Sequence, residues 1–310
     1  GEPLDVAAEM MHVALQIVGK AMFSAEIGDQ ADELATATLT VLDHIVGRAR
    51  TFGVVPEWLP TRGNRAHRRA MRVLDRAVYG TIDARRTSPP APLLSEQERG
   101  AQDLLAMLMA ATDEPTGERM SDQHLRDESM TMLIAGHETV ASALAWTWQL
   151  LAEHPEAEAR LHAELEEVLG GRAATMADLP RLRYTEWVFQ EALRLYPPAW
   201  IITRKALADD TVCGYHVPAG ALVVCSPYVT HRLAEVWDEP DAFRPERFAP
   251  EAAAGRHRFA YYPFGGGPRL CIGNYFAQVE ASLIIAAVAQ RYRLRPVEGH
   301  PVVVEPSVTL

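Results

Sequence analysis

The stretch PFGGGPRLCIGNYFAQVEASLI, from Pro263 to Ile284, decides how the rest of this sequence is interpreted. Consecutive glycines let a backbone turn sharply and approach a flat ligand closely. They precede Arg269 and Cys271, one of only three cysteines among 310 residues, at the start of an apolar stretch. A cysteine at a helix N-terminus is stabilised as thiolate, which suits a soft metal. The stretch therefore predicts a ligand-binding loop followed by a helix.

Five positions in this stretch follow the spacing F-x-x-G-x-R-x-C-x-G, with no mismatch. They are Phe264, Gly267, Arg269, Cys271 and Gly273. Arginine suits an anionic carboxylate, and a thiolate, a propionate-binding arginine and an aromatic cover together describe a haem site. A cysteine with only a structural role at a helix start is the competing interpretation.

Composition narrows the other possibilities. The formal net charge is −11 and the basic residues are scattered, which argues against a nucleic-acid interface. No apolar run reaches about 18 residues, so we predict no membrane-spanning segment. Cys213 and Cys225 form no regular framework with Cys271, and both are interpreted as ordinary buried residues rather than halves of a disulfide.

Apolar residues recur at three- and four-residue spacing through most of the first two thirds of the chain. Pro155, Gly170 and the pair Pro197-Pro198 mark helix boundaries there. The predicted helices are 4–23, 31–49, 121–154 with Ser121 as N-cap, 155–169, 185–196 and 271–290, with an exposed loop over 85–100. The alternating segment after residue 202 predicts a hairpin that turns at 218–220, in a small sheet. The fold class is therefore mainly α with a minor β-sheet.

Three further features each have a purely structural interpretation, and the first also has a functional one. In LIAGHETVASAL (Leu133–Leu144), the trio His137-Glu138-Thr139 forms either one exposed polar turn, with Gly136 allowing a close helix crossing, or part of a loosened helix that passes over a bound group, with an acid and a hydroxyl available to move protons. Glu191 and Arg194 share a helix face, which alone indicates a surface ion pair. The segment AFRPERF (Ala242–Phe248) alone indicates a solvated turn.

Taken together and in this order, the motifs resemble those of a cytochrome P450, a haem-thiolate monooxygenase. The family pattern A/G-G-x-D/E-T matches Ala135 to Thr139, E-x-x-R matches Glu191 and Arg194, and P-E-R-F matches Pro245 to Phe248. The resemblance implies a P450-like fold around a haem, with 121–154 as its long central helix. It implies one haem-binding domain over 1–310 that lacks the family's amino-terminal part, including its first sheet, and the last residues.

The resemblance also implies roles for individual residues. Cys271 would be the axial thiolate ligand of haem b, and Arg269 and Arg204 would bind its propionates. Thr139 and Glu138 would manage water and protons during oxygen activation. The remaining cofactor-binding positions would be Phe264, Gly267, Gly273, Ala135 and Gly136, and a structural charge cluster would consist of Glu191, Arg194 and Arg247.

The implied reaction inserts one oxygen atom from O2 into a hydrophobic organic substrate, by hydroxylation or epoxidation. Apolar side chains that would contact this substrate, although core packing explains them almost as well, are Ala199, Trp200, Ile201 and Ile202. Electrons would come from a separate ferredoxin or reductase, which Arg256, His257 and Arg258 could dock unless they are simply solvated.

We expect a monomeric, cytoplasmic protein, with an anchor in the missing amino-terminal part as the alternative. The functional alternatives are a haem-thiolate peroxygenase or isomerase, which usually lacks the acid–threonine pair, and a non-catalytic haem-binding sensor, which needs neither group.

Overall fold

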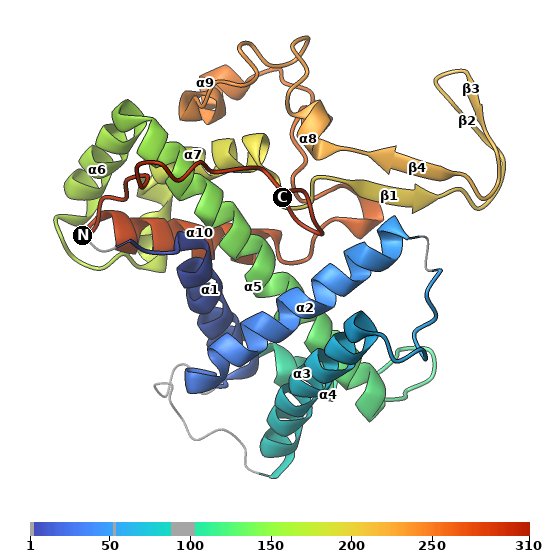
Figure 1. The fold of residues 1–310 in the computed structure, drawn as a ribbon. Coiled ribbons are helices and arrows are strands. Elements are labelled where there is room, and N and C mark those ends of the chain that lie inside the picture. Colours follow the sequence, from blue (N-terminus) through green and yellow to red (C-terminus); the bar gives the residue numbers. More distant parts are fainter. Residues whose placement is uncertain (1–2, 52–53, 88–102) are drawn as a thin grey trace. The chain divides into compact units, whose positions relative to one another are not determined.

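Figure 1 traces the computed structural model of the chain, which describes residues 3–51, 54–87 and 103–310. The chain divides into two compact units. Unit 1 comprises Gly1–Leu4 and Ser142–Leu310, and unit 2 comprises Asp5–Ala141. Each unit buries its own set of apolar side chains. The single domain expected over 1–310 stays a prediction.

Unit 2 is built from helices that surround an apolar core. In chain order these are α1 (Val6–Phe23), η1 (Gly28–Gln30), α2 (Ala31–Arg50), α3 (Arg62–Thr87), α4 (Leu104–Ala110) and the first part of α5 (Asp122–Glu153). Asp5 caps α1, because its carboxylate accepts a hydrogen bond from the Ala8 N–H at 3.1 Å. Ser24 ends this helix with a left-handed φ of 48°. Leu15 and Leu74 are fully buried in the core.

Unit 1 continues α5 and adds shorter helices and strands. The helical elements are α6 (Pro155–Leu169), η2 (Met176–Arg181), α7 (Arg183–Leu195), α8 (Pro227–Thr230), η3 (Pro245–Phe248), α9 (Pro250–Ala253), η4 (Arg258–Ala260), η5 (Gly267–Arg269) and α10 (Asn274–Ala289). Helix α7 packs against α6, α10 and η3. Leu161, Leu165, Val188 and Ile285 form part of the buried core of this unit.

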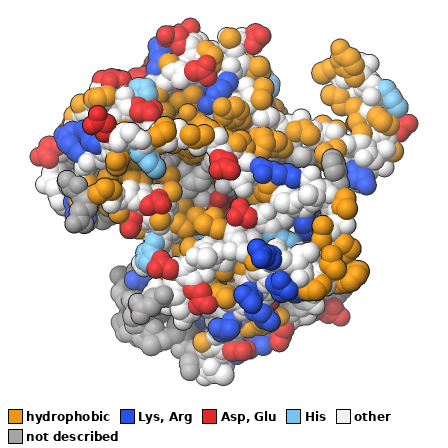
Figure 2. Space-filling model, in the orientation of Figure 1, with side chains coloured by type: hydrophobic (Ala, Val, Ile, Leu, Met, Phe, Trp, Pro, Cys, Tyr) orange, Lys and Arg blue, Asp and Glu red, His pale blue; other side chains and the backbone are white. Residues whose placement is uncertain are grey.

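The strands of unit 1 form two antiparallel pairs. The first joins β1 (Ile202–Lys205) to β4 (Leu222–Cys225), with Ile202 opposite Cys225. The second joins β2 (Asp210–Val212) to β3 (Tyr215–Val217). Figure 2 shows hydrophobic side chains at the tip of the β2–β3 hairpin, where Val212 and Tyr215 are exposed.

Most of the predicted helices are confirmed. The long helix predicted over 121–154 spans Asp122–Glu153, and the Ser121 hydroxyl accepts a hydrogen bond from the His124 N–H at 3.2 Å, as a cap does. The helices predicted near 4–23, 31–49, 155–169 and 185–196 correspond to α1, α2, α6 and α7 within two residues at each end. The last helix begins at Asn274 rather than Cys271, because Gly273 is its N-cap.

Two predictions about local structure were wrong or incomplete. The hairpin between β2 and β3 turns at Cys213 and Gly214, which have φ values of 51° and 85°, and not at 218–220, which joins β3 to β4. Helix α3 was missed. Residues 85–87 of the predicted loop belong to this helix, and residues 88–100 lie outside the described part of the chain.

Helix α1 qualifies the expectation about membranes. Among the described residues, Val6–Phe23 is the one helix whose length and composition would allow it to cross a bilayer. It carries Glu9 and Lys20, and it packs against α2 and α4 in unit 2. A core helix that covers an apolar interior passes the same length and composition test, so this observation alone is weak evidence for a membrane segment.

Candidate functional site

The loop that carries Cys271 is held in shape by its own backbone. The Cys271 N–H donates to the Phe264 carbonyl at 3.0 Å, and the Leu270 N–H donates to the Gly267 carbonyl at 3.0 Å. The Gly265 N–H donates to the Tyr262 carbonyl at 2.9 Å. These three bonds fold 262–271 back on itself just before α10.

Glycine is required at positions 265 to 267 for two different structural reasons. Gly265 and Gly267 have φ values of 75° and 72°, where a residue with a Cβ would be strained. Gly266 is extended, but a Cβ there would lie 2.8 Å from Cε1 of Phe259. The loop also contacts β1, since a Cβ on Gly265 would lie 3.5 Å from Cδ1 of Ile202.

The side chains from Pro268 to Ile272 are exposed, in contrast to the well-bonded backbone of the loop. Cys271 is exposed and forms no disulfide, and Ile272 is 84% exposed. Arg269 and Arg204 are exposed, and neither forms an ion pair with another described residue. Arg204 donates to the carbonyl of its neighbour Thr203 at 2.8 Å. A free thiol, a cation and apolar groups thus stand together on one short loop, with a second cation on β1.

The other two cysteines do not occupy the buried positions predicted for them. Cys213 lies in the β2–β3 turn and Cys225 on β4, and both are exposed and free. The strand β4 is exposed along its whole length, which explains why an apolar sequence pattern was misleading there.

A fully buried ion pair lies on α7. Arg194 Nε is 2.7 Å from one oxygen of Glu191, Nη2 is 2.8 Å from the other, and both side chains are completely buried. Nη1 and Nη2 of Arg194 also donate to the carbonyls of His231, Pro240 and Ala242. The interpretation as a surface pair was therefore wrong, because this pair holds together the backbone of the segment 231–242.

Arg247 joins this pair from η3. Its Nε lies 3.3 Å from Oε1 of Glu191, and its Nη2 donates to the Glu239 carbonyl at 2.7 Å. The Arg244 N–H donates to the same Glu191 oxygen at 2.9 Å. The structure thus brings Glu191, Arg194 and Arg247 together, and we call these three residues the charge cluster.

His231 connects the charge cluster to the cysteine loop, and sequence reasoning missed it. Its Nε2 accepts a hydrogen bond from the Tyr262 N–H at 2.9 Å, and its Nδ1 lies 3.3 Å from the Arg194 carbonyl. Burial lowers the pKa of His231 to about 3, so the ring is neutral near pH 7. The neutral ring can then donate through Nδ1 and accept through Nε2. No spacing signal marks a lone histidine of this kind.

A second bond ties the start of the loop to α7. The Tyr261 hydroxyl donates to the Gln190 carbonyl at 3.1 Å, next to the charge cluster in sequence. From Arg194 through His231 to Tyr262, then through Gly265 and Phe264 to Cys271, hydrogen bonds and short backbone steps form a continuous path.

Arg256 is part of this support rather than of a docking surface. Its guanidinium lies 4.3 Å from the ring centre of Trp237, a ring that also lies 5.0 Å from the Arg194 guanidinium, and it donates to the Arg247 carbonyl at 2.6 Å. Trp237 is 1% exposed. Of the three residues considered for partner docking, only His257 and Arg258 are exposed.

The polar turn predicted on the long helix lies in unit 2. The Thr139 hydroxyl donates to the Ala135 carbonyl at 2.8 Å, which places both residues on one face of α5. Ala135 is exposed and Thr139 is partly exposed. Gly136 allows a close helix crossing, because a Cβ there would lie 3.0 Å from Cγ2 of Val18 on α1.

The two residues between Gly136 and Thr139 are not on an exposed turn, as the bland interpretation assumed. His137 is fully buried and Glu138 is 7% exposed. The Nδ1 of His137 lies 2.6 Å from the Leu133 carbonyl, and burial lowers the pKa of this ring. The helix is continuous through this turn, so the glycine serves packing without breaking α5.

The candidate substrate residues lie after α7 in unit 1, and the last of them, Ile202, is the first residue of β1. Ala199 and Ile201 are exposed, and Ile202 contacts the glycine loop. Trp200 has a structural role, since its Nε1 donates to the Ser307 carbonyl at 3.1 Å and its carbonyl accepts from the Ser226 hydroxyl at 2.9 Å.

Comparison with known proteins places these motifs in a family. A family model described as cytochrome P450 matches residues 1–308. The chain is 41% identical to cyclooctatin synthase of Streptomyces melanosporofaciens over 99% of this chain and 66% of that protein. It is 39% identical to cyclooctat-9-en-7-ol 5-monooxygenase of the same organism, over 96% of this chain and 63% of that protein.

Similarity extends to other relatives and to a solved structure. Pentalenene oxygenase of Streptomyces avermitilis is 34% identical over 95% of this chain and 63% of that protein. The crystal structure of the cytochrome P450DA heme domain superposes with a TM-score of 0.86 and 30% identity, over 100% of this chain and 66% of that one. The chain therefore spans about two thirds of the length of these proteins.

Proposed function

The chain belongs to the cytochrome P450 family, and on that premise we propose that it is the haem-bearing part of a monooxygenase that oxidises a cyclic terpenoid. The observation that carries the proposal is the exposed, unpaired Cys271 on a glycine loop whose backbone is anchored to a buried charge cluster. Among the described residues, no group of three or more His, Cys, Asp or Glu residues gathers that could hold a metal ion by itself. A haem needs only one axial ligand from the protein.

The residues of the loop fit a haem. The Cys271 thiol is exposed and free of any disulfide, so it is open to iron. The glycines at 265 and 267 have backbone conformations that side chains would strain, and glycine lets a flat ligand come close. Arg269 and Arg204 are exposed cations that suit two propionates.

In this assignment Cys271 is the thiolate ligand. Backbone hydrogen bonds of the loop, rather than contacts of the cysteine side chain, hold Cys271 in position. A bound haem supplies the activation of O2 and the transfer of one oxygen atom, with electrons from a ferredoxin or reductase. The charge cluster and His231 hold the loop in place. We place the protein in the cytoplasm as a monomer.

On α5, we assign Thr139 and Glu138 to proton handling and Ala135 and Gly136 to the wall over the haem. The hydrogen of the Thr139 hydroxyl is donated to the Ala135 carbonyl, so the lone pairs of its oxygen can accept a hydrogen bond from water. Glu138 is nearly buried and adjacent in sequence, which suits a group that exchanges protons with few waters.

The substrate class rests on the relatives. Their names specify an alkenol, cyclooctat-9-en-7-ol, and an alkene, pentalenene. We therefore propose a cyclic terpenoid hydrocarbon or its monohydroxylated derivative as substrate. The exposed side chains of Ala199 and Ile201 and the partly exposed side chain of Ile202 support this proposal, because they offer a hydrophobic surface.

The function is tested by isotope labelling. The haem-loaded protein, with a ferredoxin, its reductase and NADPH, is given a panel of cyclic terpenes under ¹⁸O2. The proposal predicts products that carry one ¹⁸O atom. Products without label, or products formed equally well from hydrogen peroxide without O2, would contradict it.

The Thr139→Ala variant tests the proton-handling role. We expect it to consume NADPH with increased release of hydrogen peroxide and less product, because water at the site is less well ordered. The matched control is Thr131→Ala, which removes an exposed hydroxyl from the same helix. Equal coupling in both variants would refute the role of Thr139.

A further inference from the structure

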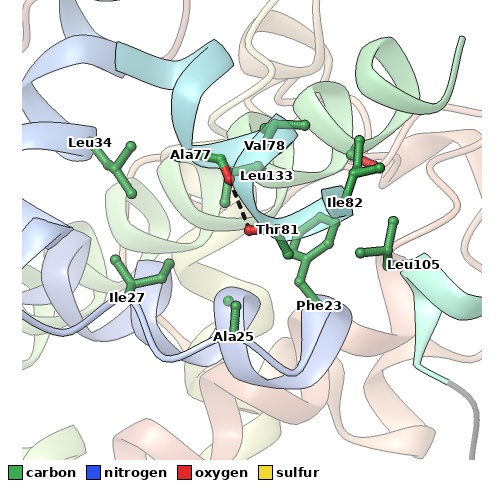
Figure 3. Close-up of a pocket in the computed structure, with 12 residues that line it drawn as sticks. Phe23, Ala25, Ile27, Leu34, Ala77, Val78, Thr81, Ile82, Leu105 and Leu133 are labelled. Carbon is green, nitrogen blue, oxygen red and sulfur yellow. Dashed lines mark hydrogen bonds between the residues drawn. The ribbon is translucent and has the colours of Figure 1, made fainter. Parts of the chain in front are cut away.

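Unit 2 contains an apolar cavity of about 40 Å³, lined by residues from the segment that runs from α1 to α5 (Figure 3). In Figure 3, Ile27 and Leu34 lie on one side of it, and Phe23, Ile82 and Leu105 lie on the other. None of the residues assigned to the haem site lines this cavity. It is therefore a separate feature of the fold.

One polar atom in the cavity wall has no partner. Ser129 on α5 is 1% exposed, and its hydroxyl makes no hydrogen bond with any described residue. The other hydroxyl in the wall, on Thr81, donates to the Ala77 carbonyl at 2.9 Å, which Figure 3 shows as a dashed line. A buried hydroxyl without a partner is unfavourable, so a ligand that pairs with Ser129 would remove a cost of the folded state.

Water is a poor occupant for this cavity. A buried water needs two to four polar partners, and the only polar side chains among the described residues of this wall are Ser129 and Thr81. An ordered molecule here would have to satisfy most of its surface with apolar contacts. That requirement favours an organic molecule with one hydrogen-bonding group at its inserted end.

The cavity adjoins a larger hollow of about 510 Å³, within the range of small-molecule sites. The two share a ring of residues that includes Phe23, Ile27, Leu34 and Thr81. The outer hollow reaches the surface, because side chains that line it are exposed. Its charged lining residues are Glu26, Glu33, Arg76 and Arg85.

Size and charge restrict the ligand. A cavity of roughly 150 Å³ holds benzene, so 40 Å³ accepts only a narrow chain end and not a ring. The inner cavity is apolar, so the inserted chain end must be uncharged. In the hollow, Arg85 is already committed to Asp103 and to the Phe23 carbonyl, which leaves Glu26, Glu33 and Arg76 and disfavours an anion.

We propose that the cavity and the hollow together form a second ligand site, for a neutral, straight-chain aliphatic molecule that ends in a hydroxyl or carbonyl group. The chain end enters the inner cavity and its oxygen pairs with the Ser129 hydroxyl. The rest of the chain occupies the hollow between α1, α2 and α3.

The probes are 1-hexanol and n-heptane, which have the same number of non-hydrogen atoms and differ in the terminal hydroxyl. Each is titrated into the methyl-labelled chain, and the methyl resonances of Ile27, Ile82 and Leu133 are followed by NMR. We expect saturable shifts at these methyls. We also expect Ser129→Ala to lower the affinity for 1-hexanol by about three- to tenfold, because one hydrogen bond is lost. The affinity for n-heptane should not fall.

Two further variants complete the test. Thr131→Ala, which removes a hydroxyl from the same helix outside the cavity, should leave both affinities unchanged. Ala25→Val should lower the affinity for both ligands, because Ala25 lines the cavity and the larger side chain fills it. Ser129→Ala should fold well, since alanine favours a helix and the lost hydroxyl had no partner.

The proposal is overturned if neither probe gives saturable shifts, or if Ser129→Ala changes the affinities for both probes by the same factor. The orientation of bound 1-hexanol can also be tested in the wild-type chain. Nuclear Overhauser effects should connect the CH2O protons of 1-hexanol to Ser129 and Leu133. Effects only to residues of the outer hollow, such as Val73, would show the opposite orientation and contradict the proposed pairing.

Discussion

The charge cluster and the cysteine loop lie on the same unit and differ in almost every respect. In the cluster, Glu191 and Arg194 are completely buried, pair with each other and hydrogen-bond to backbone groups around them. In the loop, Cys271 and Arg269 are exposed and the bonds are made by the backbone. The difference shows where this unit uses its polar side chains. It uses them to fix the backbone beneath the loop, and it leaves the loop's own side chains free for a ligand.

The largest expected effect comes from breaking the buried pair. We expect Arg194→Met to lower the free energy of unfolding by about 3–5 kcal/mol, because it leaves the Glu191 carboxylate buried with less compensation. Urea unfolding at pH 7 measures this. Arg244→Met is the matched control, since its pairs with Asp238 and Glu239 are exposed and should be worth less than about 1 kcal/mol. Similar losses in both variants would remove the distinction between the regions.

A second buried carboxyl, on α10 after the loop, predicts a pH dependence. Glu280 has no hydrogen-bond partner among the described residues, and burial raises its pKa from 4.5 to about 8. Its contribution to stability is therefore present below about pH 4.5 and is lost as the pH rises through 8. The loss approaches about 1.4 kcal/mol per pH unit inside that window.

The Glu280→Gln variant isolates this contribution. Between pH 5 and pH 8 we expect the wild type to lose about 3 kcal/mol more stability than the variant does, measured by urea unfolding at each pH. Parallel curves for the two proteins would mean that Glu280 is ionised or paired in the fold.

A smaller effect tests whether His231 transmits the position of the cluster to the loop. We expect His231→Phe to speed hydrogen exchange at the amides of Tyr262 and Cys271 by about tenfold, because the bond to Tyr262 is lost. His231→Gln, whose side-chain oxygen can still accept from Tyr262, should retain most of the protection.

The control is His154→Phe, which replaces a half-buried histidine between α5 and α6 that bonds the nearby Leu150 carbonyl of α5. It should leave the loop amides unchanged. If His231→Phe accelerates Tyr262 but not Cys271, the two ends of the path are independent. Hydrogen exchange at the amides of α6 is measured alongside, because it reports global unfolding and so distinguishes global unfolding from local opening of the loop.

The sequence predicted the long helix and the loop because both depend on local chemistry. Ser121 marks the start of α5 as a cap, and Pro155 marks its end by starting the next helix. The glycines before Cys271 predicted a turn, and the structure shows two of them in left-handed conformations. Such residues reveal their role through spacing and type alone.

What the sequence could not predict depends on burial. An i, i+3 pair such as Glu191 and Arg194 has the same spacing on a surface as in a core, and only tertiary packing distinguishes the two. Helix α3 was missed because it is rich in arginine and its apolar residues form a narrow stripe through Leu74, Val78 and Ile82. His231 acts through partners that are distant in sequence, which leaves no local signal.

The central claim is that Cys271 is the thiolate ligand of a haem, and a carbon monoxide difference spectrum tests it most directly. The haem-loaded protein is reduced, exposed to carbon monoxide and compared with the Cys271→Ser variant, with Cys225→Ser as a control at another exposed cysteine. The account predicts a Soret band at the thiolate-shifted position in the wild type and the control, and its loss in Cys271→Ser. An unshifted band in the wild type, or a shifted band that survives Cys271→Ser, would contradict it.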